Sequence, residues 1–356
     1  MNNNPLPSNH PEVARSQHVV PQTYMKQWSH KDPFIYVYDK RSYKPSIKER
    51  SVKSINYIDN TYDFLPGDIY IPQEGLDEMY SFLDGYDIQC EGKSLKSHQE
   101  MNSQYLDIDK WVISKNGKVI DSKEVENIES KLSSARYCFI ESEWGKQYEN
   151  QWVSHITDLE FKLRNKCDLT DDDLQLVMKY LLMFDFRSES KNDFIEECFG
   201  DASQFLLDIS DGKDYSIPEN DRVHPEEDTA LKQMRGNYYR RQYYDYLRYG
   251  TGVISVVLDA YLKKFELGFF LNYEQVKLIT SNNPVFVHLD DTNHKQKFFI
   301  ATPTLMILLG KRVDSEPYMI CKMGRDTVDR MNGIVYQDND LIILPTSNYN
   351  IESLQQ

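Results

Sequence analysis

The sequence has few cysteines, and they are odd in number, far apart and without any Cys-x-x-Cys pair. This spacing excludes a disulfide framework and a zinc knuckle. It fits a reducing compartment, so we predict a cytoplasmic protein. The cysteines are Cys90, Cys138, Cys167, Cys198 and Cys321.

The sequence also lacks a long apolar run and a basic leader followed by an apolar stretch. A membrane helix needs about 18 consecutive apolar residues, so we predict no membrane span and no signal peptide. Residues 1–16 are rich in Asn, Pro and Ser and are expected to form a flexible tail.

Several motifs of nucleotide and metal chemistry are missing as well. The chain contains no G-x-x-x-x-G-K loop, no G-x-G-x-x-G turn, no H-E-x-x-H helix and no G-x-S-x-G elbow. These absences exclude P-loop NTPases, simple dinucleotide binders, zincins and elbow-type hydrolases. The sequence indicates no particular cofactor, and we predict no metal site.

Acidic residues dominate the charge. The chain carries 41 Lys and Arg against 56 Asp and Glu, a net charge of -15, which disfavours extensive nucleic-acid binding. Residues 232–244 nevertheless interleave cations with tyrosines, as faces that bind single strands do. The alternative is a solvated helix whose tyrosines pack inward.

The 356 residues are 40% hydrophobic and 27% charged, which is typical of a globular protein. We predict one large domain over residues 17–345, with a loop-rich excursion at about 60–120 and a tail at 346–356. Residues 60–108 show no clear periodicity and receive no assignment.

The pattern predicts an α+β fold. Residues 34–39 read as a strand, and Asn116-Gly117 as the turn of a hairpin over 111–120. Helical spacing predicts helices at 122–135, 152–163, 170–182 with Thr170 as its cap, 226–249, 253–265 and 325–336. Short strands are expected at 269–271, 276–280, 285–288, 298–301, 305–309 and 341–344. Close spacing favours a mostly antiparallel sheet of these carboxy-terminal strands, joined by the amino-terminal strand and packed with amphipathic helices.

Three segments carry a resemblance. His18-Val19-Val20-Pro21-Gln22-Thr23-Tyr24-Met25 precedes the first strand, a helix ends at Arg187, and the turn Thr280-Ser281-Asn282-Asn283-Pro284 lies between apolar runs. With them, the chain resembles the bacterial domain-of-unknown-function family 4238 over most of its length.

The resemblance implies functional positions without implying an activity, substrate or cofactor. It points to His18, Pro21, Gln22 and Tyr24, to Arg187, and to Asn283 and Pro284. At these positions we predict His18, Tyr24 and Arg187 as catalytic residues, and Gln22, Asn282 and Asn283 as ligand-binding residues. The family's usual Asp in the late turn is Asn282 here. A mechanism that needs a carboxylate at that position therefore does not follow for this chain.

The chemistry of these residues leaves two interpretations open. An imidazole with an arginine suits acid-base work or phosphoryl stabilisation. Alternatively, His18 donates to a backbone carbonyl and Arg187 pairs with Asp185 or Glu189 at a helix end, because buried polar groups are hydrogen-bonded in any case. Asn282 and Asn283 either present amides to a ligand or simply form a turn before Pro284.

Two further patterns carry weaker signals for metal chemistry. Asp87 with Glu91-Gly92-Lys93 is similar to the acids and lysine of restriction-type nucleases, but short motifs of this kind recur by chance. His288 and His294 flank Asp290 and Asp291 in an expected hairpin loop, which is either a weak divalent site or simply a wet loop.

We predict an intracellular effector, with phage defence as its role and with a hydrolytic or nucleic-acid-processing site at His18, Tyr24 and Arg187. The alternative is a non-catalytic protein-interaction or scaffold protein, which uses tyrosine-rich surfaces and an acidic field. The substrate or partner, whether protein, small molecule or nucleic acid, is not specified by the sequence.

Overall fold

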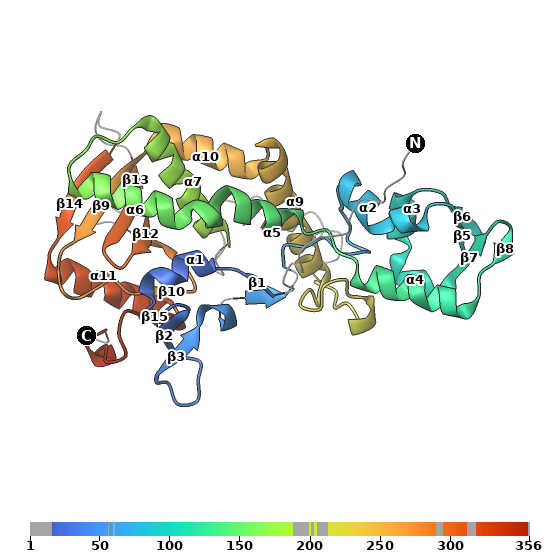
Figure 1. Ribbon diagram of the computed structural model, residues 1–356, viewed down its shortest axis with the longest axis horizontal. Coiled ribbons are helices and arrows are strands. Elements are labelled where there is room, and N and C mark those ends of the chain that lie inside the picture. Colours follow the sequence, from blue (N-terminus) through green and yellow to red (C-terminus); the bar gives the residue numbers. More distant parts are fainter. Residues whose placement is uncertain are drawn as a thin grey trace. The chain divides into compact units, whose positions relative to one another are not determined.

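The computed structural model describes residues 16–55, 57–59, 61–187, 199–200, 203–204, 213–289, 295–311 and 318–354. Within these residues the chain has the α+β fold expected from the sequence (Figure 1). It divides into two compact units, each assembled from separate stretches of chain. Unit 1 comprises Met1–Gln17, Asp59–Ser142 and Ser203–Tyr244, and unit 2 comprises His18–Ile58, Glu143–Ala202 and Asp245–Gln356. The single domain over residues 17–345 stays a prediction.

A five-stranded sheet forms the core of unit 2. Its order is β11 (Val285–Leu289), β12 (Lys295–Thr302), β13 (Leu305–Lys311), β9 (Phe265–Asn272) and β14 (Tyr318–Met323). Every neighbouring pair is antiparallel except β14 and β9, which are parallel. Helices α7 (Asp171–Arg187) and α10 (Val253–Lys264) pack against each other and against β11 and β9 (Figure 1).

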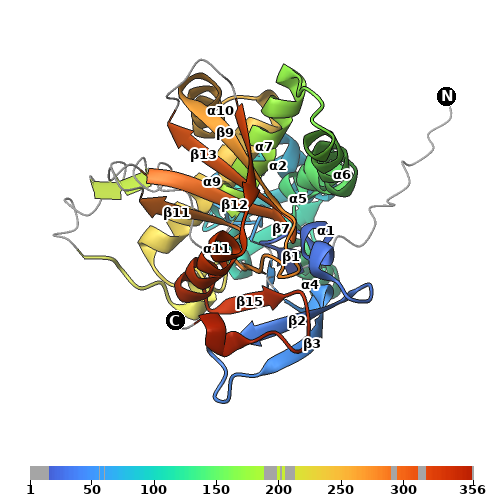
Figure 2. The same ribbon diagram turned by 90° about the vertical axis from the view of Figure 1, so that its left-hand side faces the viewer.

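The second sheet of unit 2 joins the two ends of the chain. Its order is β10 (Thr280–Ser281), β15 (Leu341–Leu344), β2 (Phe34–Asp39) and β3 (Ile47–Ser51), and all its pairs are antiparallel. Helix α11 (Arg325–Asp338) contacts β10, beside this sheet (Figure 2). The pairing of β2 with β15 confirms that an amino-terminal strand returns to a carboxy-terminal sheet.

The expected strand at 276–280 is wrong except at Thr280. The backbone of Leu278 is used elsewhere, because its N–H donates to the Pro303 carbonyl and its carbonyl accepts from the Trp28 indole. A buried peptide group satisfied in this way has no bond left for a neighbouring strand.

Several shorter elements remain, and some of them lie where the chain passes from one unit to the other. Strand β1 (Ser16–His18) pairs with β4 (Tyr57–Asp59), and α1 (Gln22–Met25) is followed by η1 (Lys26–Trp28). The π-helix η5 (Gly145–Glu149) joins α5 (Phe139–Trp144) to α6 (Asn150–Arg164). The short 3-10 helices η2 (Val52–Ser54) and η7 (Ile351–Leu354) also belong to unit 2. The Thr170 hydroxyl accepts from the Asp173 N–H, which confirms the predicted cap of α7.

Unit 1 contains a small sheet with the order β6 (Lys93–Leu95), β5 (Asp87–Cys90), β7 (Trp111–Lys115) and β8 (Lys118–Val119). Asn116 and Gly117 both have positive φ, at 53° and 74°, which confirms the predicted hairpin turn. Helix α4 (Ser122–Ser134) follows the hairpin, as its spacing predicts.

Residues 60–108 contain more regular structure than the expected loop-rich excursion. They include α2 (Gln73–Tyr80), η3 (Ser81–Leu83), β5, β6, α3 (His98–Ser103) and the start of η4 (Tyr105–Lys110). The helices among these elements are too short to show a helical period in the sequence. Helix α3 instead begins with a capping box, in which Ser97 and Glu100 each accept from the other's backbone N–H.

Helix α9 (Ala230–Tyr249) begins later than the predicted start at residue 226, and the short η6 (Glu219–Asp221) precedes it. The residues between Pro225 and Ala230 are not helical, because Thr229 forms a β-bridge with Ser216 and the Asp228 carbonyl accepts from the Ile217 N–H. Tyr239, Tyr243 and Tyr244 on this helix are buried, so these tyrosines of the 232–244 strip pack inward.

Candidate functional site

The segment from His18 to Trp28 is held by short helical turns that follow a proline. Pro21 has φ of -54°, and its carbonyl accepts from the N–H groups of Tyr24 and Met25. Because proline fixes φ and needs no donor at this position, it starts α1 without leaving a buried N–H unsatisfied. The segment thereby aims Tyr24 and Trp28 into the core of unit 2, where both are buried.

The imidazole of His18 is half buried, with a polar partner at each nitrogen. Its Nε2 lies 3.2 Å from the Val52 carbonyl, and its Nδ1 lies 3.3 Å from the Gln22 side-chain nitrogen. Since a carbonyl only accepts, Nε2 carries the proton and Nδ1 accepts from Gln22. Burial lowers the pKa of His18 below its ordinary value of 6.5, against opposing effects of the Val52 carbonyl and Glu149, which favours this neutral form.

Tyr24 is completely buried, and its hydroxyl is bonded from two sides. The hydroxyl donates to the Ile300 carbonyl at 2.6 Å, so the Thr280 hydroxyl, also at 2.6 Å, must be the donor of the second bond. Its ring packs against Phe184, 4.7 Å between centroids, and Trp28, at 5.0 Å. Burial raises the pKa of Tyr24 strongly, so the phenol stays protonated near neutral pH.

Arg187, at the carboxy-terminal end of α7, is also fully buried. Its guanidinium pairs with the Glu149 carboxylate and donates to the His18 main-chain carbonyl. The same guanidinium lies 5.7 Å from the ring centroid of Trp144. The π-helix η5 supplies Glu149, and the irregular turn is what places this carboxylate at the end of α7.

In the non-catalytic interpretation of Arg187, its guanidinium is expected to pair with the carboxylate of Asp185 or Glu189. Glu189 lies outside the described residues. Asp185 pairs with Lys297 of β12 at 2.7 Å, which ties α7 to the five-stranded sheet.

The late turn is closed by its own side chains. The Ser281 hydroxyl accepts from the Asn283 N–H and donates to the Asn283 carbonyl, both at 3.0 Å. The Asn283 amide donates to the Asn339 side chain at 2.9 Å, and the Asn282 N–H donates to the Leu341 carbonyl at 3.3 Å. This is the turn chemistry that polar residues before a proline favour. Asn282 is buried, and Asn283 is partly exposed.

The structure brings the predicted residues together in two pairs of segments. The hydrogen bond between Tyr24 and Thr280 joins the amino-terminal segment to the late turn, and the bond from Arg187 to His18 joins it to α7. Gln22 contacts the His18 ring. The assignment of catalytic and ligand-binding roles to these residues stays a prediction.

A buried cluster of charges in unit 1 was missed by the sequence interpretation. The Arg240 guanidinium bonds to Glu227 at 2.9 Å and to Asp68 at 3.0 Å, and the His224 imidazole lies 3.1 Å from the Asp68 carboxylate. Arg240 and His224 lower the pKa of Asp68 despite its burial, whereas burial dominates for Glu227 and raises its pKa. The available signal was Arg240 inside the 232–244 strip, but both interpretations of that strip place its cations at the surface.

The nuclease-like pattern at Asp87 and Glu91-Gly92-Lys93 is part of a β-hairpin. Glu91 and Gly92 are its turn, with φ of 50° and 80°, and all four of these residues are exposed. The described residues hold no group of three or more His, Cys, Asp or Glu that could bind a metal ion. Of the other pattern, His288 lies on β11, while Asp290, Asp291 and His294 lie outside the described residues.

Comparison with known proteins gives one match. A family model described as "Protein of unknown function (DUF4238)" matches residues 16–343. No match was found among curated proteins or among solved structures. Of the helices formed by the described residues, none is both long and apolar enough to cross a membrane.

Proposed function

The chain belongs to the DUF4238 family, whose description assigns no activity, and we propose that it is a non-catalytic recognition protein. In this proposal the residues of the His18–Tyr24 segment, Arg187 and the late turn form a structural framework. The observation that carries it is the complete burial of Tyr24, whose hydroxyl is bonded both to Ile300 and to Thr280.

The other two residues support the same proposal. A general base needs a nitrogen within hydrogen-bond reach of its substrate, but both nitrogens of His18 already have protein partners. Arg187 has no exposed surface and binds protein groups, whereas an arginine that stabilises a substrate oxyanion must reach it. A framework role accounts for all of these contacts, since buried polar groups must be satisfied.

The excess of acidic residues indicates the kind of partner. A net charge of -15 attracts basic surfaces and repels nucleic acid at neutral pH. The proposed partner is therefore a protein or ligand that carries positive charge, and its binding weakens as the salt concentration rises.

A hydrolytic or nucleic-acid-processing effector is the second candidate, and phage defence would follow from it. One observation favours it: Arg187 joins the His18 main chain to the Glu149 carboxylate, so an imidazole, a cation and an acid lie close together. Such a group has the composition of an acid-base site if Gln22 can leave the imidazole.

The two candidates are separated by an activity test on the purified chain. Wild type, His18→Gln and His98→Gln are incubated with single- and double-stranded DNA, RNA and a chromogenic phosphate ester, with Mg²⁺ or Mn²⁺. His98 is a control in unit 1, where its ring bonds to Asp77 and Asp84.

We expect the wild-type protein to turn over these substrates no faster than the His18→Gln variant does. Turnover by wild type and His98→Gln that is absent from a folded His18→Gln protein would overturn the recognition proposal in favour of the hydrolytic one. Circular dichroism of each variant establishes that it is folded.

A further inference from the structure

A pocket of ≈ 240 Å³ opens in unit 2 between α6, α7 and the strands β12 and β13. Its walls are aromatic and aliphatic, with Trp152, Tyr180 and Phe299 among them. The volume lies between the roughly 150 Å³ of a cavity that takes benzene and the roughly 300 Å³ at which drug-sized pockets begin. It therefore suits one aromatic ring system with a short side chain.

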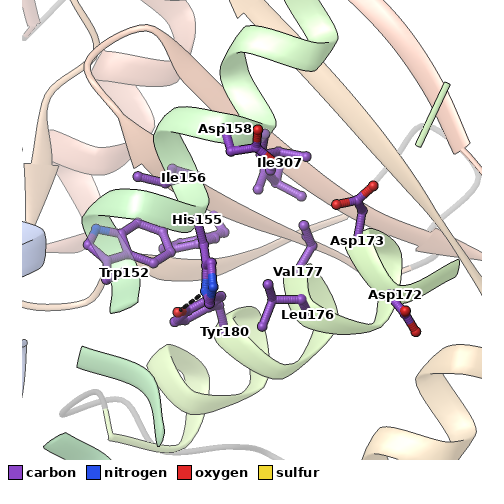
Figure 3. Close-up of a pocket in the computed structure, with 12 residues that line it drawn as sticks. Trp152, His155, Ile156, Asp158, Asp172, Asp173, Leu176, Val177, Tyr180 and Ile307 are labelled. Atoms are coloured by element: carbon purple, nitrogen blue, oxygen red, sulfur yellow. Dashed lines mark hydrogen bonds between the residues drawn. The ribbon is translucent and has the colours of Figure 1, made fainter. Parts of the chain in front are cut away.

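One end of the pocket offers a hydrogen-bond acceptor. The Tyr180 hydroxyl donates to the Tyr148 carbonyl at 3.2 Å, so the 2.8 Å contact with His155 must be a bond from His155 Nδ1–H to the Tyr180 oxygen. In the neutral imidazole, Nε2 is then left as an acceptor. Figure 3 shows this pair at one end of the lining, with Leu176 and Val177 between it and the acids of α7, Asp172 and Asp173.

The other end of the pocket is acidic. Asp158, Asp172 and Asp173 line it, and its lining contains no Lys or Arg. Lys162 lies outside the lining and is shared, since its ammonium is 2.8 Å from both Asp158 and Asp173. Asp173 also accepts from the Thr170 N–H and hydroxyl, each at 2.9 Å, so it belongs to the cap of α7. The three carboxylates share one ammonium, so this end of the pocket keeps a net negative charge. A cation in the pocket would complement this charge and face the aromatic walls.

We propose that this pocket binds a protonated arylalkylamine whose ring carries a hydrogen-bond donor. The ring lies among Trp152, Tyr180 and Phe299, the ring donor bonds to His155 Nε2, and the ammonium faces Asp172 and Asp173. The inference goes beyond the proposed function, because a pocket for this ligand serves a recognition protein and an enzyme equally.

The test is titration calorimetry of the full chain with tryptamine as the probe. Indole-3-acetate keeps the ring and reverses the charge, 3-methylindole removes the charge, and phenethylamine removes the ring donor. We expect tryptamine to bind at least tenfold more tightly than each of the three. Absence of tryptamine binding, or equal or tighter binding of indole-3-acetate, would overturn the proposal.

Three variants locate the binding. Leu176→Trp fills the pocket from a half-buried position and should lower the affinity for tryptamine at least tenfold. The control Val153→Trp, on the exposed side of α6, should change this affinity by less than twofold. Asp172→Lys changes an exposed rim residue, so it should fold, and should weaken tryptamine at least fivefold without affecting 3-methylindole.

Unchanged affinity of tryptamine for Asp172→Lys, or for a folded Leu176→Trp, would also overturn the proposal. The activity test of His18→Gln is independent of these titrations, so a failure of the ligand inference is distinguishable from a failure of the recognition proposal.

Discussion

The carboxylate of Glu227 lies against the α-carbon of Gly236, and a β-carbon built at Gly236 would meet Glu227 Oε1 at 1.8 Å. Gly236 lies inside helix α9, where glycine is ordinarily unfavourable. The close approach explains it, because only glycine leaves room for the carboxylate that pairs with Arg240.

Replacing Gly236 by Ala should therefore destabilise the protein, although alanine is the better helix former. We expect a loss of about 1–3 kcal/mol in the free energy of unfolding, measured by urea denaturation. Gly333→Ala in α11 is the matched control, because a β-carbon there meets nothing within 4 Å, and it should stabilise by up to about 1 kcal/mol. Equal effects of the two variants would contradict the close packing at Gly236.

Tyr24→Phe should cost about 1–3 kcal/mol of stability, because it leaves the buried Ile300 carbonyl and Thr280 hydroxyl without their partner. Tyr43→Phe removes the same hydroxyl from a side chain that is 96% exposed, and should cause no measurable change. Chemical denaturation of both variants checks this. A Tyr24→Phe protein as stable as wild type would mean that these two hydrogen bonds contribute nothing net.

Arg187→Met should be among the most damaging single changes in unit 2. It leaves the Glu149 carboxylate without its cation, and breaking a buried ion pair costs about 3–5 kcal/mol. The double variant with Glu149→Gln should be less destabilised than the sum of the single effects, with a coupling of about 0.5–3 kcal/mol in a double-mutant cycle. Arg325→Met, which breaks the exposed pair with Asp329, is the control and should have no measurable effect.

The lowered pKa of His18 predicts a pH dependence of stability. Because the folded state binds this proton more weakly than the unfolded chain, the contribution of His18 is present above its ordinary pKa of 6.5 and is lost as pH falls through the lower folded value. Urea unfolding of wild type and His18→Gln between about pH 8 and about pH 5 should therefore give a stability difference that shifts against wild type as pH decreases. A difference that is constant over this range would contradict the assigned neutral state.

The sequence predicted the elements whose patterns are long or whose turn chemistry is strict. Strand β2, the hairpin at Asn116-Gly117 and the capped helix α7 all follow from residues close in the chain. Strand β14 was not predicted, and it pairs with β9 in parallel. The start of β9 was also wrong, because helical spacing extends the preceding helix to Phe265, where the strand begins. Tertiary pairing decides where such strands begin and end, and the local sequence does not indicate this pairing.

The candidate site was predictable as a set of positions and not as an arrangement. Nothing near Arg187 in the chain indicates Glu149, since the π-helix that supplies this carboxylate has no sequence signature comparable to a capping box. The charged cluster around Asp68 was hidden for the same reason. His224 and Arg240 lie more than 150 positions after Asp68 in the sequence, and only the tertiary fold brings their side chains to its carboxylate.

The pairing of Val37 in β2 with Ile343 in β15 also bears on synthesis of the protein. While a ribosome is still making the polypeptide, β2 has already emerged and its partner has not been translated. One edge of the nascent strand β2 therefore stays unpaired until residues 341–344 have been synthesised, while β3 pairs with its other edge. This segment should consequently need chaperones most during translation. A chain that terminates before residue 341 would keep an unpaired edge on β2, which can pair with other chains and aggregate.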